Sequence, residues 1–269
     1  MRCRRTYDAE VITHLKFNNR IILNIQRLSS SNLIVLAAEI MFVALSITKF
    51  KTTTIPFGFL GMAILRLPLW LNKKCIFWKL MGNGKDAQVD LAPDYKHWSI
   101  LTTWENEADF RAFEQHSSVM KWFRFFGMEE FTILLKPLSA HGLWSGIEPF
   151  KAERTATNST ERIAVITRAS IHFRRLKEFR ENIKQAADAM RSAEGFILSA
   201  GMGENPFVDQ ATFSIWENSQ SMKDYAYKSV DHANVIKLTR ERKWYKEELF
   251  ARFEIIECKG SLNGQSLTN

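Results

Sequence analysis

The stretch HGLWSGIEPF, residues 141 to 150, holds an imidazole and an indole within a segment rich in loop-forming residues. Its two glycines and Pro149 predict a loop, because glycine reaches backbone angles that other residues avoid and proline fixes its own. Loops usually run over the surface, so His141 and Trp144 either pack as a plug or bind something. The loop residues alone leave both readings open.

A second chemically capable group lies in TRERKWYKEELF, which begins at Thr239. Arg240 and Arg242 stand beside aromatic residues, and a guanidinium pairs with carboxylates through a planar fork and stacks on rings. This chemistry suits the binding of an anionic ligand. The spacing of Arg240, Lys243 and Glu247 equally describes a solvated helix face with ordinary ion pairs.

The charge of the chain is concentrated at its N-terminus. The formal net charge is +8 over 269 residues, and the first 30 residues hold six Lys or Arg against two acids. The remainder is near neutral and carries no nucleic-acid-reading motif, so we expect no nucleic-acid partner. The basic N-terminal segment is expected to allow a peripheral contact with anionic lipid.

The cysteines and the most apolar run predict the compartment. Cys3, Cys75 and Cys258 form no C-x-x-C pair, so neither a disulfide framework nor a thiolate metal site is expected. The run from Leu33 to Ile47 spans about 15 residues and contains Glu39, whereas crossing a bilayer takes about 20. We therefore expect no transmembrane helix here, no signal peptide, and a cytoplasmic location that includes membrane association only at the periphery.

The sequence repeats a local pattern. Trp104-Glu105-Asn106 and Trp216-Glu217-Asn218 each end a strand-like run and open a helix-like one, with the asparagine placed as an N-cap. An apolar run with a glycine-bearing turn precedes each copy, and a further strand candidate follows it. The two halves are thus expected to share one architecture.

Each half reads strand, helix, strand, strand, helix, strand, which is the ferredoxin-like order. We predict an α+β fold of two tandem ferredoxin-like (βαββαβ) repeats that pack sheet to sheet as an intramolecular α+β barrel, because each sheet would otherwise leave an apolar face bare. The expected boundaries are a basic N-terminal extension over residues 1–40, the first repeat over 41–150, a linker over 151–160, the second repeat over 161–258 and a flexible tail over 259–269.

Four ordered motifs carry a resemblance to a known family. FWKLMGNG from Phe77, the Trp-Glu-Asn-Glu-Ala strand end, HGLWSGIEPF and TRERKWYKEELFARF resemble the spheroidene monooxygenase family, carotenoid-modifying enzymes related to the dimeric α+β barrel monooxygenases. The resemblance covers roughly Met41 to Ile256. It implies oxygen insertion at the end of an acyclic carotenoid, haem as the cofactor, and an electron donor such as a reductase or ferredoxin.

A haem implied in this way needs an axial ligand, usually imidazole, and cations for its propionates. His232 is our first choice for the haem iron because it follows Asp231, an expected N-cap, at a break in the chain, although a capping or surface histidine fits as well. His141 is the second choice, against a role as a hydrogen-bonded hinge residue. Arg240 and Arg242 are the expected propionate partners.

Aromatic residues are abundant, with 20 Phe and 8 Trp, and a long polyene needs a wide apolar slot. An ordinary core uses the same residues. The expected substrate pocket belongs to the second half, closed near His141, and is lined by five aromatic residues: Trp144, Trp216, Tyr225, Trp244 and Tyr245.

Two alternatives to the haem enzyme remain open at this point. One is a cofactor-independent or flavin-using monooxygenase of the same barrel type, in which the substrate itself activates oxygen. The other is a non-catalytic barrel that carries lipid or pigment.

Overall fold

The computed structural model of the chain describes residues 41–85, 92–152, 161–205, 208–228, 238–239 and 241–267. The expected basic extension over residues 1–40 lies outside the described residues, as does most of the expected linker over 151–160. The domain boundaries therefore stay predictions.

The described part of the first half contains four strands and several short helices. Pro56 stands at the start of α3, where its fixed φ angle and missing N–H suit the first helical turn. Its elements, in chain order, are β1 (Phe42–Phe50), η2 (Thr52–Thr54), α3 (Ile55–Ile64), α4 (Arg66–Leu71), β2 (Cys75–Gly84), β3 (Pro93–Trp104), α5 (Glu107–His116), α6 (Ser118–Phe126) and β4 (Gly127–Gly142).

The second half follows the same order of strands and helices. Its elements are β5 (Ile163–Ile171), η4 (Phe173–Arg175), α7 (Leu176–Arg191), β6 (Phe196–Asn205), β7 (Asp209–Trp216), α8 (Ser219–Lys228), β8 (Tyr245–Leu262) and β9 (Gln265–Ser266). β8 extends to Leu262 and forms a hairpin with β9, so the prediction of a flexible tail from residue 259 is corrected. Gly264, in the hairpin turn with φ 77°, allows the chain to reverse there.

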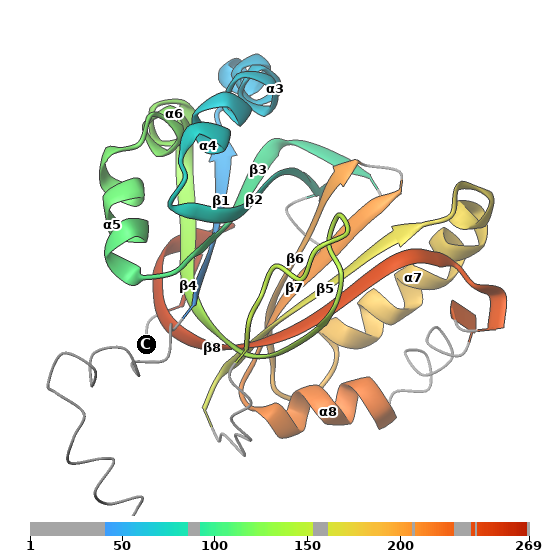
Figure 1. Cartoon of the computed structure of the whole chain (residues 1–269). Helices are drawn as coiled ribbons and strands as arrows, with labels where there is room; N and C mark the ends of the chain where they lie inside the picture. Colours follow the sequence, from blue (N-terminus) through green and yellow to red (C-terminus); the bar gives the residue numbers. More distant parts are fainter. Residues whose placement is uncertain are drawn as a thin grey trace, which may run out of the picture. The chain divides into compact units, whose positions relative to one another are not determined.

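Eight antiparallel strands close into a barrel (Figure 1). The strand order is β4-β1-β3-β2-β6-β7-β5-β8, and β4 also pairs with β8. The predicted α+β barrel is thereby confirmed. The two four-stranded sheets face each other as expected, but they are also joined by hydrogen bonds at both edges, which the sequence did not predict.

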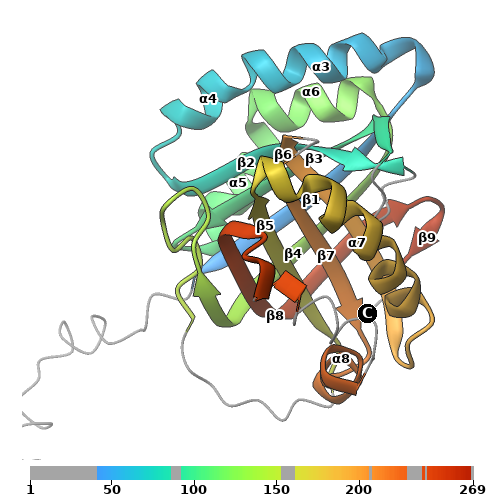
Figure 2. The same cartoon turned by 90° about the vertical axis from the view of Figure 1, so that its right-hand side faces the viewer.

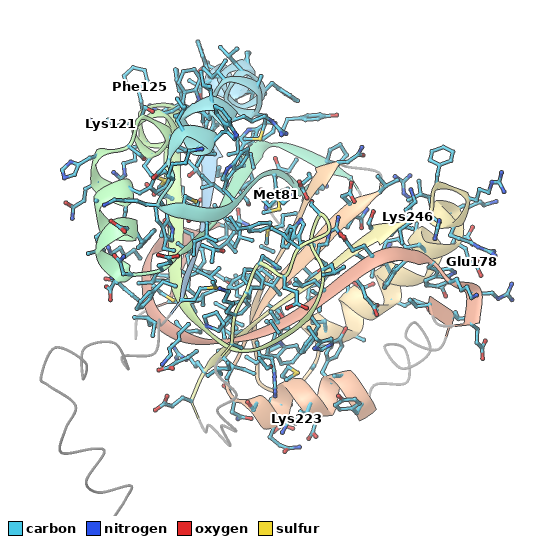
Figure 3. All side chains as sticks on the ribbon, in the orientation of Figure 1. Met81, Lys121, Phe125, Glu178, Lys223 and Lys246 are labelled. Atoms are coloured by element: carbon cyan, nitrogen blue, oxygen red, sulfur yellow. The ribbon has the colours of Figure 1, made fainter. Side chains whose placement is uncertain are left out.

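The strands alternate between an inner and an outer face, and each face has its own core. The inner core takes residues from all eight strands, among them Leu45, Met81 and Phe213, so the barrel is filled by side chains (Figure 3). On the outside, α3, α4, α5 and α6 cover the first sheet, and α7 and α8 cover the second (Figure 2).

The two Trp-Glu-Asn turns have matching geometry. The Asn106 side chain accepts a hydrogen bond from the Asp109 amide at 2.9 Å, and Asn218 accepts one from the Ser221 amide at 2.9 Å. Each preceding tryptophan is buried and donates its indole N–H to a hydroxyl two residues earlier in the strand, at 2.9 Å and 3.0 Å. The predicted N-caps are confirmed, and they fix where each strand turns into its helix.

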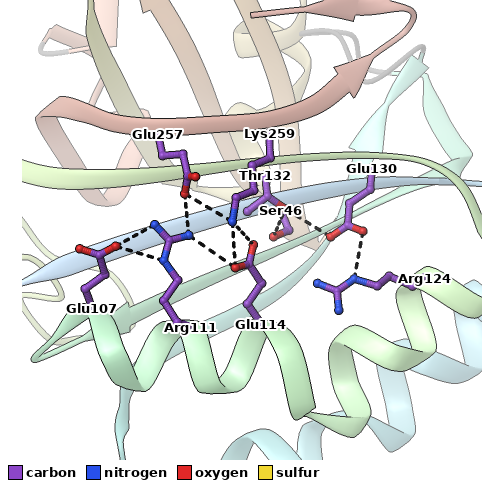
Figure 4. Close-up of polar contacts among 9 residues, drawn as sticks. All are labelled: Ser46, Glu107, Arg111, Glu114, Arg124, Glu130, Thr132, Glu257 and Lys259. Atoms are coloured by element: carbon purple, nitrogen blue, oxygen red, sulfur yellow. Dashed lines mark hydrogen bonds and ion pairs between the residues drawn. The ribbon is translucent and has the colours of Figure 1, made fainter. Parts of the chain in front are cut away.

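Charged residues tie the first half's helix α5 to the second half's strand β8 (Figure 4). Arg111 lies between Glu107 at 2.7 Å and Glu257 at 2.5 Å, and Lys259 reaches Glu114 at 3.1 Å. Burial alone would raise the pKa of Glu257, but Arg111 and Lys259 outweigh it and hold that pKa below its usual range. This network reinforces the β4–β8 edge on its outer side.

Candidate active site

The segment that connects α8 to β8 carries the two residues expected to matter most. His232 and Arg240 both lie in this connection and outside the described residues. Their roles stay predictions. The described neighbours on either side, α8 and the start of β8, show what surrounds the two ends of the segment.

Trp244 is buried where the connection enters β8. The Trp244 ring packs edge to face against the Phe179 ring of α7, with centroids 6.1 Å apart. The Tyr245 ring packs against the same Phe179 ring, with centroids 6.2 Å apart. Burial raises the pKa of Tyr245 above its usual value, which keeps its hydroxyl protonated. The indole N–H of Trp244 is buried and has no hydrogen-bond acceptor among the described residues. An unpaired buried donor is costly, so this is a position where a ligand atom would be stabilising.

Trp216 and Tyr225 form a separate pair between α8 and the second sheet. Their rings stack with centroids 5.2 Å apart, and the Tyr225 hydroxyl donates to the Ala186 carbonyl of α7 at 3.0 Å. This pair belongs to a different core cluster from Trp244 and Tyr245. Its contacts bind α7 to α8.

Arg242 is exposed on a short helical turn before β8. Its Nε lies 3.9 Å from a carboxylate oxygen of Glu178, at the limit of an ion pair between two solvated groups. The spacing of Arg240, Lys243 and Glu247 suggested that all three lie on one solvated helix face. This prediction is wrong for Glu247, which lies in a strand. Residues 245–250 belong to β8, and the Glu247 side chain points to the barrel interior.

His141 is a strand residue and not a loop residue. It stands in β4 opposite Phe250 of β8, with its exposed ring 5.3 Å from the Phe250 ring. Phe250 packs on the helix side of the second sheet, so His141 lies on the outer face of the barrel wall. The structure thus separates His141 from Trp144, which the sequence had grouped together.

Trp144 closes the barrel from inside. The loop of residues 143–150, here called the Trp144 loop, turns tightly, with the Trp144 amide donating to the Ile147 carbonyl at 2.8 Å. Gly142 and Gly146 take φ values of 93° and 79°, which only glycine adopts without strain, so these residues let the chain fold back into the barrel. The Trp144 ring packs in the inner core, 5.7 Å from the Phe77 ring. The plug reading of HGLWSGIEPF is therefore correct for its tryptophan.

Five charged side chains surround the Trp144 loop at one end of the barrel, and we call them the polar mouth. They come from β2, β5, β6, β7 and β8, and each stands two residues along its strand from an inward-facing apolar residue. They are Lys79, Arg168, Glu204, Asp209 and Glu247. Sequence reasoning missed them. Period-two alternation, as in Phe77-x-Lys79-x-Met81, was the available signal.

The polar mouth clamps the Trp144 loop. Lys79 donates to Glu204 at 2.7 Å and to the Ser145 hydroxyl at 2.6 Å, while Glu204 accepts the Trp144 indole N–H at 2.7 Å. Glu247 accepts the amides of Ser145 and of the following glycine at 2.8 and 2.7 Å. The loop is thus held by carboxylates that receive its N–H groups.

Arg168 lies beneath the loop at the centre of the polar mouth. Its side chain is only 5% exposed, it pairs with Glu247, and it reaches Asp209 at 3.0 Å. Its guanidinium carbon lies 5.8 Å from the centre of the Trp144 ring, within cation–π range. Two carboxylates and a ring hold this buried charge in place, and losing one carboxylate would leave it only partly compensated.

Glu247→Gln is expected to lower the free energy of unfolding by roughly 2 kcal/mol at neutral pH, because Arg168 loses one of its two anionic partners. Burial alone would raise the pKa of Glu247, but the two loop amides and Arg168 outweigh it and hold the pKa below its ordinary 4.5. The stabilisation is therefore present above that value and lost as pH falls through the folded-state pKa. Urea unfolding across pH 3 to 7 measures both effects.

The matched control for this experiment is Glu248→Gln, which removes an exposed charge from the next position of β8. It should unfold like the wild-type protein at every pH. If Glu247→Gln matches the control, the clamp on the Trp144 loop contributes no stability.

The described part of the helix side of the second sheet has one buried donor that a ligand could satisfy. Phe179 and Trp244 are buried against each other there, the Trp244 N–H has no acceptor, and the cation Arg242 is exposed on the turn before β8. Among the described residues, no group of three or more His, Cys, Asp or Glu is placed to hold a metal ion. An acceptor atom at the Trp244 N–H and a propionate at Arg242 are the contacts that a haem could make with these residues.

Comparison with known proteins defines the family. A family model described as a domain of unknown function, DUF3291, matches residues 161–253. The spheroidene monooxygenase of Rhodobacter capsulatus is 31% identical over 224 residues, which cover 82% of this chain and 93% of that protein. The spheroidene monooxygenase of Cereibacter sphaeroides is 33% identical over 83% of this chain and 69% of that protein.

A solved structure of an aldoxime dehydratase in complex with butyraldoxime shares the fold. Its TM-score is 0.56 at 8% identity, with 81% of this chain and 80% of that chain covered. The solved structure shows the fold alone, whereas the identity to the two spheroidene monooxygenases extends over most of each chain. The chain belongs to the spheroidene monooxygenase family of enzymes.

Proposed function

We propose that this protein is a haem-dependent monooxygenase that inserts oxygen into a carotenoid or a similar long apolar substrate. The observation that carries the proposal is the 31% identity to a spheroidene monooxygenase over 93% of that relative's length. That relative is named for a carotenoid substrate. The unpaired Trp244 N–H and the exposed cation Arg242 support a cofactor on the helix side of the second sheet.

In this proposal the chain's own residues hold and orient the haem. His232 would hold the haem iron through its imidazole, and Arg240 and Arg242 would pair with the propionates. Trp244 offers its buried N–H to an acceptor, and Tyr245 keeps its proton at neutral pH beside it. When bound, haem supplies an iron centre for activating dioxygen.

The reaction requires an electron donor. Insertion of one oxygen atom of O2 into a C–H bond, with the other atom leaving as water, consumes two electrons and two protons. The donor we propose is a reductase or a ferredoxin. We propose the cytoplasm as the compartment, supported by Cys75 and Cys258, which are both free thiols.

We also infer that the two halves are tandem ferredoxin-like repeats. Numbered within each half, the strands of both sheets follow the order 4-1-3-2, and both halves have the element order βαββαβ. The matching N-caps at Asn106 and Asn218 support the same inference.

The cofactor proposal is tested by producing the full chain with haem supplied and recording its absorption spectrum. A Soret band in stoichiometric amount, together with oxygenation of a carotenoid when a reductant is present, is the expected result. Activity from a colourless protein would indicate that the substrate itself activates oxygen and that no haem is needed. Activity from a yellow protein would indicate a flavin. Either result overturns the haem part of the proposal while leaving the family intact.

A further inference from the structure

One surface of the first half is unusually apolar. Of the fifteen exposed large hydrophobic side chains among the described residues, seven lie on α3 and α4. Leu67 is 60% exposed and Trp70 62%, and Phe125 on the neighbouring helix α6 is 78% exposed (Figure 3). The full set on these three helices, called the apolar face, is Phe57, Phe59, Leu60, Ile64, Leu67, Trp70, Leu71 and Phe125.

The helices of the apolar face form one continuous surface. The Phe57 ring of α3 stacks on Phe126 of α6 at 4.2 Å, and the Trp122 indole donates to the Phe57 carbonyl at 3.2 Å. In both cartoon views α3, α4 and α6 lie together on the side of the first sheet (Figures 1 and 2). Soluble proteins rarely expose large contiguous apolar patches without a binding role, and eight exposed apolar side chains gather on these three helices.

The helical run lies along the barrel and does not leave it. Residues Thr52–Leu71, a run of 20, are long and apolar enough to cross a membrane, with a mean hydropathy of 1.5 in an 18-residue window. Yet β1 and β2, at its two ends, both pair antiparallel with β3, so the run must travel back beside the strands. Leu65 and Leu69 anchor it in the core beneath. Such a helix presents its outer side to a surface and cannot span a bilayer.

Positive charge predominates on the helices of the apolar face. Between Glu39 and Asp86 the sequence contains no acidic residue, and α6 contains none either. Lys74 and Arg124 are exposed but pair with Asp109 and Glu130 from neighbouring elements. Four further cations are exposed along the same helices and at their ends: Lys51, Arg66, Lys73 and Lys121. Lys73 lies 4.8 Å above the Trp70 ring, and tryptophan and lysine together are typical of the boundary between headgroups and acyl chains.

We propose that the apolar face docks onto the surface of an anionic lipid bilayer, with α3 and α4 lying in the plane of the headgroups. The apolar side chains enter the acyl boundary, and the surrounding cations pair with lipid phosphates. The inference assigns membrane contact to this built surface and not to the basic N-terminal segment. It rests on exposure and charge, and is independent of the cofactor and the substrate.

The test measures binding of the full chain to vesicles by co-sedimentation, without haem or carotenoid. One vesicle type is phosphatidylcholine alone, and the other is an equal mixture of phosphatidylcholine and phosphatidylglycerol. Wild-type protein should bind the mixed vesicles more tightly. Leu67→Ser with Trp70→Ser should weaken binding to them by roughly tenfold or more. Lys51→Gln with Lys121→Gln should weaken it by roughly fivefold per cation, on the anionic vesicles alone.

Matched controls come from the second half, where Phe173 and Tyr227 are 75% and 78% exposed. Phe173→Ser with Tyr227→Ser removes a comparable apolar area, and Lys177→Gln with Lys184→Gln removes two exposed charges from α7. Both controls should bind like wild type. Equal binding by the apolar-face variants and the controls would overturn the proposal and leave the N-terminal segment as the contact.

Light scattering in lipid-free buffer separates lipid from a second copy of the chain as the occupant. The proposal predicts that the Leu67→Ser, Trp70→Ser variant and the wild type have the same mass. A wild-type dimer that this variant converts to a monomer, without vesicle binding, would make the apolar face a self-association surface instead.

Discussion

His232→Ala is expected to lose haem and oxygenation activity together while the protein still folds. On the proposal above, the His232 imidazole would be the protein group that coordinates the haem iron, so affinity for haem should fall by roughly 100-fold. Titration of the apoprotein with haem, followed at the Soret band, measures this without any turnover. Far-ultraviolet circular dichroism establishes that the variant is folded, and added imidazole should restore part of the band.

Two other histidines serve as controls for this result. His116→Ala alters the residue at the end of α5 in the first half, and it should keep both haem and activity. His141→Ala tests the second imidazole considered, which lies exposed on the outer wall beside Phe250. Loss of haem in His116→Ala with retention in His232→Ala would assign the cofactor to the first half. Loss in His141→Ala alone would assign it to the β4–β8 wall.

Trp144→Ala is expected to lower the free energy of unfolding by about 3 to 5 kcal/mol, the range for removing a large aromatic ring from a packed core. The ring is 1% exposed, contacts Phe77, and its N–H satisfies Glu204. The substitution would therefore leave a cavity in the barrel and a carboxylate short of one donor. Urea unfolding followed by circular dichroism gives the value.

Trp144→Phe separates the two contributions. It keeps most of the apolar volume and removes only the hydrogen bond to Glu204, so it should cost roughly 1 to 2 kcal/mol. A loss of under about 1 kcal/mol for Trp144→Ala would mean that the ring does not support the inner core, contrary to its contacts.

Much of the fold could be predicted from local patterns. Asn106 and Asn218 predicted where strands end and helices begin, because an asparagine at this position accepts a hydrogen bond from an amide of the first helical turn. The strand and helix order of each half predicted a sheet covered by helices on one face, and burying the other apolar face against its counterpart gave the barrel. The start of β8 was not predicted. The charged run before Ala251 has helical spacing, and only pairing with β4 and β5 draws residues 245–250 into a strand.

The candidate site was harder to predict, because residue type does not give the direction of a side chain. The five aromatics grouped as one pocket occupy three places: Trp144 is inside the barrel, Trp216 and Tyr225 stack against α8, and Trp244 and Tyr245 pack against α7. The polar mouth draws one residue from each of five strands. Such residues become neighbours only after the barrel closes, so no short stretch of sequence contains them together.

The two edges that join the halves of the barrel are unequal. β4 and β8 are paired from Phe131 to Gly142, whereas β2 and β6 meet only at Gly82 with Gly203 and at Asn83 with Met202. At the short edge, cohesion therefore depends on side chains: the Lys79–Glu204 ion pair and the hydrogen bond from Asn83 to the Gly201 carbonyl at 3.1 Å. The Lys79–Glu204 pair therefore serves two contacts at once, because Glu204 also accepts the Trp144 indole N–H. The side chains that hold Trp144 inside the barrel are thus the same ones that join the two sheets at their short edge.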